Sequence, residues 1–276
     1  MRRVIKGIVY TKIFFDNMQK HALSAYAAQA AYYIILSAFP FFMFLLTMVK
    51  HLPIDQWQMI AYVEANLPTP VATSITRIIK EVFTSSGTVA SITILTTLWA
   101  ASKAFCSLIY GLNTVYEHKE NRNYFILRLE ATLHTVIFSV LLLATLLLLA
   151  FGNRITHTLL QHFPSLEDAV FLVISIRTSA SMCLLILFFL YMYIWIPNRK
   201  SSILEALPGA IATAVGWIGF SFLYSFYIDH ISNFNNTYGS LTAIVLLMLW
   251  LYFCMYMLLV GGELNALIAS IRKQKY

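Results

Sequence analysis

Residues 88–110 read TVASITILTTLWAASKAFCSLIY, a stretch with one charged side chain, Lys103. A helix needs about 20 apolar residues to cross the hydrocarbon core of a bilayer, so this stretch predicts a membrane-spanning helix. Outward along the chain, further apolar runs complete a set of six predicted spans, at about 30–49, 88–110, 131–151, 170–195, 207–228 and 240–262. Helices are favoured because an open sheet would leave backbone groups unpaired in lipid, and because these runs lack the alternation of barrel strands.

Composition indicates the same fold class. Of the 276 residues, 59% are hydrophobic and 11% are charged, whereas soluble domains carry about 25% charged residues. No segment has the composition of a soluble domain, so residues 1–276 are expected to form a single polytopic membrane domain, an all-α bundle of six transmembrane helices. The net charge of +7 is then expected at the bilayer edges rather than on nucleic acid.

Lys and Arg are distributed unevenly between the two ends of the spans. The N-terminal segment, the second and fourth loops and the C-terminal segment hold thirteen of them, and the other three loops hold only Arg77, Lys80 and Arg154. Short loops rich in Lys and Arg stay in the cytoplasm. Both termini are therefore predicted to be cytoplasmic.

Two segments outside the spans have helical periodicity. Ile5, Val9 and Ile13 recur opposite basic residues, which predicts an N-terminal amphipathic helix on the inner leaflet; the alternative is a solvated lead-in to the first span. In the first loop, Asp55 is a candidate N-cap and Thr69-Pro70 indicates a second helix start. Two short amphipathic helices are therefore expected on the outer face, either as lids on a cavity or as surface packing.

Polar side chains form a stripe on the first predicted span. Steps of three and four place on one helix face Tyr26, Gln29, Tyr33, Ser37 and Pro40. Such a stripe must face protein or water rather than acyl chains. Pro40 is also expected to kink the helix, because it frees a backbone carbonyl one turn earlier. Two interpretations stay open: a polar cavity for a substrate, or hydrogen bonding between helices with no ligand.

The second predicted span places Trp99 and Lys103 on one face, with Ser102 beside them. An unpaired Lys near a helix centre costs about 2.5 to 3.5 kcal/mol on insertion scales, so Lys103 needs a partner, a wet cavity or a path to the membrane surface. Glu263, in the inner half of the last span, is the expected partner. Two hypotheses follow: the pair is structural, or Lys103 handles a substrate.

A second ion pair is expected in the outer half of the membrane. Arg177 lies in the outer third of the fourth span, and Asp229 lies near the outer end of the fifth. The alternative is that Arg177 extends to the outer membrane surface by itself.

Residues for enzyme chemistry are scarce. The seven His residues are scattered, and no His-x-x-x-His or Cys-x-x-Cys spacing offers metal ligands. The acidic residues are mostly dispersed among loops, which does not suit a two-metal nuclease. We therefore expect no enzyme activity, no catalytic residue, no metal and no cofactor.

Several short runs together resemble one known family. They are AAQAAYY at 27–33 with SAFP at 37–40, WAASKAF at 99–105 with GLN at 111–113, YGS at 238–240 and GGELNA at 261–266. In order and spacing they are similar to the YihY/virulence factor BrkB family, over nearly the whole chain. The resemblance implies a multi-pass bacterial inner-membrane protein of six helices with both ends inside, and it adds Asn113 and Asn265 to the candidate residues.

The resemblance implies less about activity. Members have carried an old label, ribonuclease BN, a tRNA-processing nuclease; others are associated with serum resistance or with export of envelope lipid precursors. Our leading hypothesis is a transporter or lipid-translocating protein whose partners are membrane lipids and whose substrate is an anionic lipid or small anion opposite Lys103. The rival is a scaffold whose polar residues only hold helices together, and the nuclease is a distant third. Substrate, energy coupling and oligomeric state are not encoded in these patterns.

The charge distribution predicts the topology. A reporter fused after Tyr276 or within residues 115–125 should read cytoplasmic, and one within residues 55–85 should read external, because Lys-rich and Arg-rich loops stay inside. Phosphatase and fluorescent-protein fusions at these points are the measurement. Opposite readings would contradict the charge argument.

Overall fold

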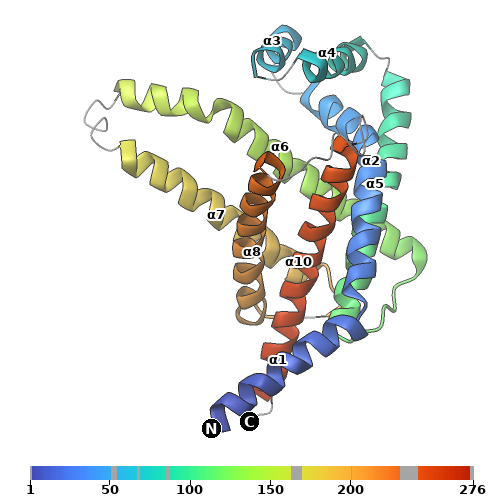
Figure 1. Cartoon of the computed structure of the whole chain (residues 1–276). Coiled ribbons are helices and arrows are strands. Elements are labelled where there is room, and N and C mark those ends of the chain that lie inside the picture. Colours follow the sequence, from blue (N-terminus) through green and yellow to red (C-terminus); the bar gives the residue numbers. More distant parts are fainter. Residues whose placement is uncertain are drawn as a thin grey trace. The chain divides into compact units, whose positions relative to one another are not determined.

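The structure is a computed structural model, and it describes residues 2–50, 55–66, 69–84, 87–162, 170–199, 201–230 and 242–273. Within these ranges all regular structure is helical, which confirms the all-α class. Figure 1 shows the helices, which are α1 (Arg2–Lys20), α2 (Leu23–Lys50), α3 (Gln56–Asn66), α4 (Thr69–Thr84), α5 (Gly87–Val115), α6 (Tyr124–His162), α7 (Val170–Trp195), α8 (Ile203–His230) and α10 (Thr242–Lys273).

The predicted spans fall on the long helices. Apart from residues 240–241, each lies within α2, α5, α6, α7, α8 or α10. Among the described residues, three segments are apolar and long enough to cross a membrane, Tyr124–Leu143, Ile203–Ile228 and Ile244–Lys273. The protein is thus a helical protein with candidate transmembrane segments, and the number of six crossings stays a prediction.

The expected N-cap in the first loop is confirmed. The carbonyl of Asp55 accepts bonds from the backbone N–H groups of Gln58 (3.1 Å) and Met59 (3.2 Å) at the start of α3. The Asp55 carboxylate accepts a further bond from the N–H of Trp57 at 3.4 Å. Because these bonds are local, the sequence pattern was sufficient to place this helix start.

The N-terminal segment forms the helix α1. Several apolar side chains of this helix, from Ile8 onward, are exposed. Ile8 is 66% exposed, and Val9 and Ile13 are exposed as well. The side chain of Ile5 lies outside the described residues. An exposed apolar face fits the expected amphipathic helix, while its location on a lipid surface stays a prediction.

The chain divides into two compact units. Unit 1 consists of residues 1–32, 106–124 and 151–276, and unit 2 consists of residues 33–105 and 125–150. In unit 1, α10 contacts α8 and α1, and α8 contacts α7; in unit 2, α3 contacts α4. The expected single membrane domain stays a prediction, and each unit is described below by itself.

In unit 1 the helices α8 and α10 approach closely at two glycines. A Cβ on Gly209 would overlap the carbonyl oxygen of Gly261, and one on Gly261 would overlap the hydroxyl of Thr213. The Tyr193 hydroxyl of α7 lies 2.6 Å from the Thr213 hydroxyl and donates to the Leu258 carbonyl at 2.7 Å. Small residues at a helix crossing allow such backbone proximity.

Unit 2 has one aromatic contact between helices and one set of buried aliphatic side chains. The Phe105 and Phe138 rings, from α5 and α6, meet edge to face with centroids 6.0 Å apart. In α3 and α4 the buried apolar residues are Ile60, Ala72, Ile79 and Val82. The periodicity of the α4 residues gives this helix one buried apolar face.

We expect Gly209→Ala to lower the free energy of unfolding by about 1 to 3 kcal/mol, because the added methyl group forces α8 away from α10. Gly219→Ala is the matched control on the same helix, since a Cβ there meets nothing within 4 Å. The measurement is thermal unfolding of the purified protein in detergent. Equal midpoints for the two variants would show that the close approach is not required.

Candidate functional site

A buried hydrogen-bonded pair joins two distant segments of the chain in unit 1. His21 lies in the turn between α1 and α2, and its Nδ1 is 2.8 Å from Oε2 of Glu263 on α10. Glu263 has no exposed surface and His21 is 4% exposed. The pair therefore satisfies a carboxylate that would be costly to bury alone.

The pair continues toward the surface. His21 Nε2 lies 3.7 Å from Oε1 of Glu117, the same oxygen that accepts a bond from the Lys20 ammonium at 2.9 Å. Hydrogen bonding to Lys20 is the main cause that holds the pKa of the exposed Glu117 below its ordinary value. Among the described residues, the second oxygen of Glu263, Oε1, has no hydrogen-bond partner. Two acidic groups thus lie on either side of one imidazole.

Asn113 connects three segments at the end of α5. Its amide group donates to Oε2 of Glu120 at 2.7 Å, and its carbonyl oxygen accepts from the N–H of Asn198 at 2.7 Å. Burial raises the pKa of Glu120, but bonds from Arg122 and Asn113 outweigh it and lower the pKa overall. Both hydrogen-bonding ends of the Asn113 side chain are occupied, which indicates a structural role.

Asn265 connects α10 to α8 beside a helix irregularity. Pro208 lies inside α8, where it disturbs the regular pattern of backbone bonds. The carbonyl oxygen of Asn265 accepts from the N–H of Gly209 at 2.6 Å, and its amide group donates to the Ala206 carbonyl at 3.1 Å. Asn265 therefore supplies partners to backbone groups on both sides of the proline.

The polar residues of α2 divide between the units. In unit 1, Gln29 is exposed, and its Oε1 accepts a bond from the Ser107 hydroxyl at 3.1 Å. In unit 2, Tyr33 is half-buried and Ser37 is 5% exposed, with its hydroxyl donating to the Ile34 carbonyl at 3.1 Å. The helix continues through Pro40, whose side chain lies outside the described residues.

Lys103 is exposed on α5 in unit 2. Its ammonium lies 5.3 Å from the centre of the Tyr33 ring. Within the described part of unit 2, no carboxylate lies within ion-pair distance of it. Glu263 belongs to unit 1 and has His21 as its partner, so the pair between Lys103 and Glu263 stays a prediction.

Unit 2 also contains a buried cation, Arg128, which the charge count above includes among the Lys and Arg residues of the second loop. Arg128 is 4% exposed in α6, and its guanidinium lies 4.5 Å from the centre of the Trp99 ring and donates to the Trp99 carbonyl. Ser102 is fully buried and its hydroxyl donates to the same carbonyl at 3.0 Å. In the sequence, Arg128 stands just before an apolar run. This position suits a buried cation and a solvated one equally, so the sequence does not predict its burial.

The ion pair expected in the outer half of the membrane is not part of the described structure. The side chains of Arg177 and Asp229 lie outside the described residues, so their ion pair stays a prediction. Among the residues that the structure describes, no group of three or more His, Cys, Asp or Glu side chains has the arrangement of a metal site.

Long apolar helices joined by buried polar side chains define a helical membrane protein. The chain belongs to the family described as Virulence factor BrkB, whose family model matches residues 14–276. This establishes the resemblance that the sequence motifs indicated.

Individual relatives agree with the family. The chain is 32% identical over 267 residues to the putative ribonuclease-like protein YfkH of Bacillus subtilis, covering 96% of each chain. It is 23% identical over 271 residues to a UPF0761 membrane protein of Pseudoalteromonas atlantica, covering 95% of this chain and 87% of the relative. No solved structure matches the chain.

We expect the buried pair to be energetically coupled. His21→Leu or Glu263→Met alone leaves one buried polar group without its partner and should lower the free energy of unfolding by about 3 kcal/mol, whereas the double variant should recover most of it. Thermal unfolding of all three variants measures this.

The matched control is the exposed pair of Lys20 and Glu117, whose side chains are 67% and 68% exposed. Lys20→Met, Glu117→Gln and their double should show little coupling, because exposed ion pairs are screened by water. A buried pair that couples no more strongly than this exposed pair would contradict a stabilising role for Glu263.

Proposed function

We propose that this membrane protein translocates an anionic lipid, an envelope precursor or another small anion across the bacterial inner membrane. Lys103 carries this proposal. It is a cation in the middle of the apolar helix α5, it is exposed, and the contact described for its ammonium is the ring of Tyr33.

An exposed ammonium inside a membrane requires a compensating charge. Its cost is about 2.5 to 3.5 kcal/mol at a helix centre, and an aromatic ring 5.3 Å away offsets only part of it. A phosphate headgroup or a small anion supplies the rest. The topology proposed with this function has both termini in the cytoplasm and six crossings.

The identity of Glu263's partner supports the same proposal. The carboxyl group of Glu263 contacts His21 in unit 1, so Glu263 does not depend on Lys103 for a partner. Lys103 is then available to a substrate rather than committed to a structural pair.

A scaffold is the second candidate function, and one observation favours it. The amide side chains of Asn113 and Asn265 use both of their ends in bonds to other segments, which is how a purely structural residue behaves. We assign these two residues to structure and keep Lys103 as the substrate candidate. A ribonuclease, as in the name of the Bacillus subtilis relative, is our third candidate.

Lys103→Met should abolish translocation while the protein stays inserted and folded, because the variant removes the charge that attracts the substrate. The measurement is flux of fluorescent anionic lipid and of small anions in liposomes containing the purified protein. Lys119→Met, at an exposed loop position, is the control and should leave flux unchanged.

The double variant with Glu263→Gln separates the two functions. If Lys103 only served to pair with Glu263, the double variant would recover abundance, stability and flux together. Our proposal requires that flux stays lost in the double variant and is lower than in Glu263→Gln alone, since that single variant already removes the partner of His21. Unchanged flux in Lys103→Met alone would reject the substrate role directly and favour the scaffold.

A further inference from the structure

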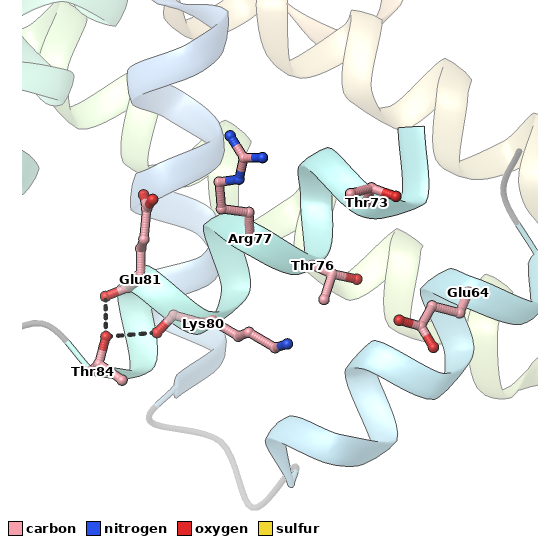
Figure 2. Close-up of a pocket in the computed structure, with 7 residues that line it drawn as sticks. All are labelled: Glu64, Thr73, Thr76, Arg77, Lys80, Glu81 and Thr84. Atoms are coloured by element: carbon pink, nitrogen blue, oxygen red, sulfur yellow. Dashed lines mark hydrogen bonds between the residues drawn. The ribbon is translucent and has the colours of Figure 1, made fainter. Parts of the chain in front are cut away.

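A pocket of about 500 Å³ lies between α3 and α4, both of which belong to unit 2. Figure 2 shows Glu64 on α3 facing the polar residues of α4. The pocket includes none of the residues assigned above to translocation. An inference about it therefore stands independently of the proposed function.

One hydroxyl in this pocket has an unused hydrogen-bonding capacity. Thr76 is 8% exposed, and within the described residues its Oγ1 has no hydrogen-bond partner. The neighbouring Thr73 and Thr84 each donate to the carbonyl four residues earlier, at 2.8 Å. A buried hydroxyl without a partner is costly unless something outside the chain bonds to it.

Two opposite charges face the same space as this hydroxyl. The Lys80 ammonium and the Glu64 carboxylate extend into the gap between the helices, with the Thr76 hydroxyl between them in Figure 2. No ion pair joins Lys80 to Glu64 in this described part of the chain. Arg77 and Glu81 extend away from Glu64 in the same view. The inner lining is thus one cation, one hydroxyl and one anion, separated from one another.

We propose that this pocket binds a zwitterion that carries a phosphate and an ammonium group, as in phosphoethanolamine. The phosphate accepts bonds from the Lys80 ammonium and the Thr76 hydroxyl, and the ammonium of the ligand donates to the Glu64 carboxylate. A simple anion would use only the first two residues and would leave its charge facing Glu64. The neutral sum of the inner charges therefore favours a zwitterion over an anion.

Exposed aromatic residues on α3 indicate where such a ligand comes from. Trp57 is 69% exposed and Tyr62 is 50% exposed. Trp and Tyr are enriched at the level of the lipid headgroups. The ligand is then either the headgroup of an ethanolamine phospholipid or the same group in free form, and the two sources share the chemistry that the pocket recognises.

The test is calorimetric titration of the full-length protein, purified in detergent and freed of lipid. The ligands are phosphoethanolamine, ethanolamine, inorganic phosphate and a short-chain phosphatidylethanolamine. We expect phosphoethanolamine to bind at least about tenfold more tightly than ethanolamine or phosphate, because only it engages both charges. Tighter binding of the phospholipid identifies a membrane source, and equal binding identifies a soluble one.

Variants of the pocket distinguish a zwitterion site from an anion site. Glu64→Gln and Lys80→Met should each weaken phosphoethanolamine about tenfold. The same charges are removed at exposed positions of α1 in the controls Asp16→Asn and Lys12→Met, which should bind normally.

Thr76→Val adds a readout that a structural role does not predict. It should weaken binding while leaving the thermal midpoint of the ligand-free protein unchanged or raised, because it replaces an unsatisfied hydroxyl with a methyl group of the same shape. Binding of inorganic phosphate as tight as that of phosphoethanolamine, or normal affinity in Glu64→Gln, would overturn the zwitterion assignment. If none of the four ligands binds, the assignment of this pocket as a binding site is wrong.

Discussion

A carboxyl group without exposed surface has to find a hydrogen-bond partner inside the protein, and Glu263 imposes this requirement on unit 1. Its partner, His21, lies in the short turn between α1 and α2, where Ala22 adopts a positive φ of 49°. The turn holds the imidazole against α10, and α1 in turn packs on α10. The entry of the chain into its first long helix is thus fixed by a residue of the last one.

The close approach of α8 and α10 provides the other constraint on unit 1. Gly209 and Gly261 bring the two backbones near enough for a single amide side chain, Asn265, to bond directly to the backbone of α8. This matters because Pro208 leaves α8 irregular at the same level. Tight packing and the hydrogen bonds at the proline site depend on each other, since a larger residue at Gly209 would displace the Asn265 amide.

Local features could be predicted from the sequence, and distant pairings could not. The helix over residues 170–195 follows from the length of its apolar run, and the Asp55 cap follows from residues two to four positions away. The partner of Glu263 did not follow, because His21 stands 242 residues earlier with no periodicity to associate them. Lys103 was expected as the counter-charge because both residues lie in the inner halves of their spans, and that pair stays a prediction.

In the candidate site, too, contacts between residues distant in sequence could not be predicted. Asn113 and Asn265 entered through motif resemblance, and their roles as connectors became visible only with the backbone groups of Asn198 and Gly209 in place. The burial of Arg128 could not be predicted, because its neighbours in sequence suit either a loop or a buried position. The spare hydroxyl of Thr76 is recognisable only by comparison with Thr73 and Thr84, which have the same chemistry and a satisfied bond.

The separation of His21 from Glu263 has a consequence for biogenesis. Translation at about 5 to 20 residues per second makes the imidazole emerge roughly 10 to 50 s before the carboxylate. During that interval α1 and α2 exist without the contact that later joins the turn between them to α10. The contact between His21 and α10 can therefore form only once α10 has been synthesised, and a chain that stops before α10 leaves His21 without Glu263.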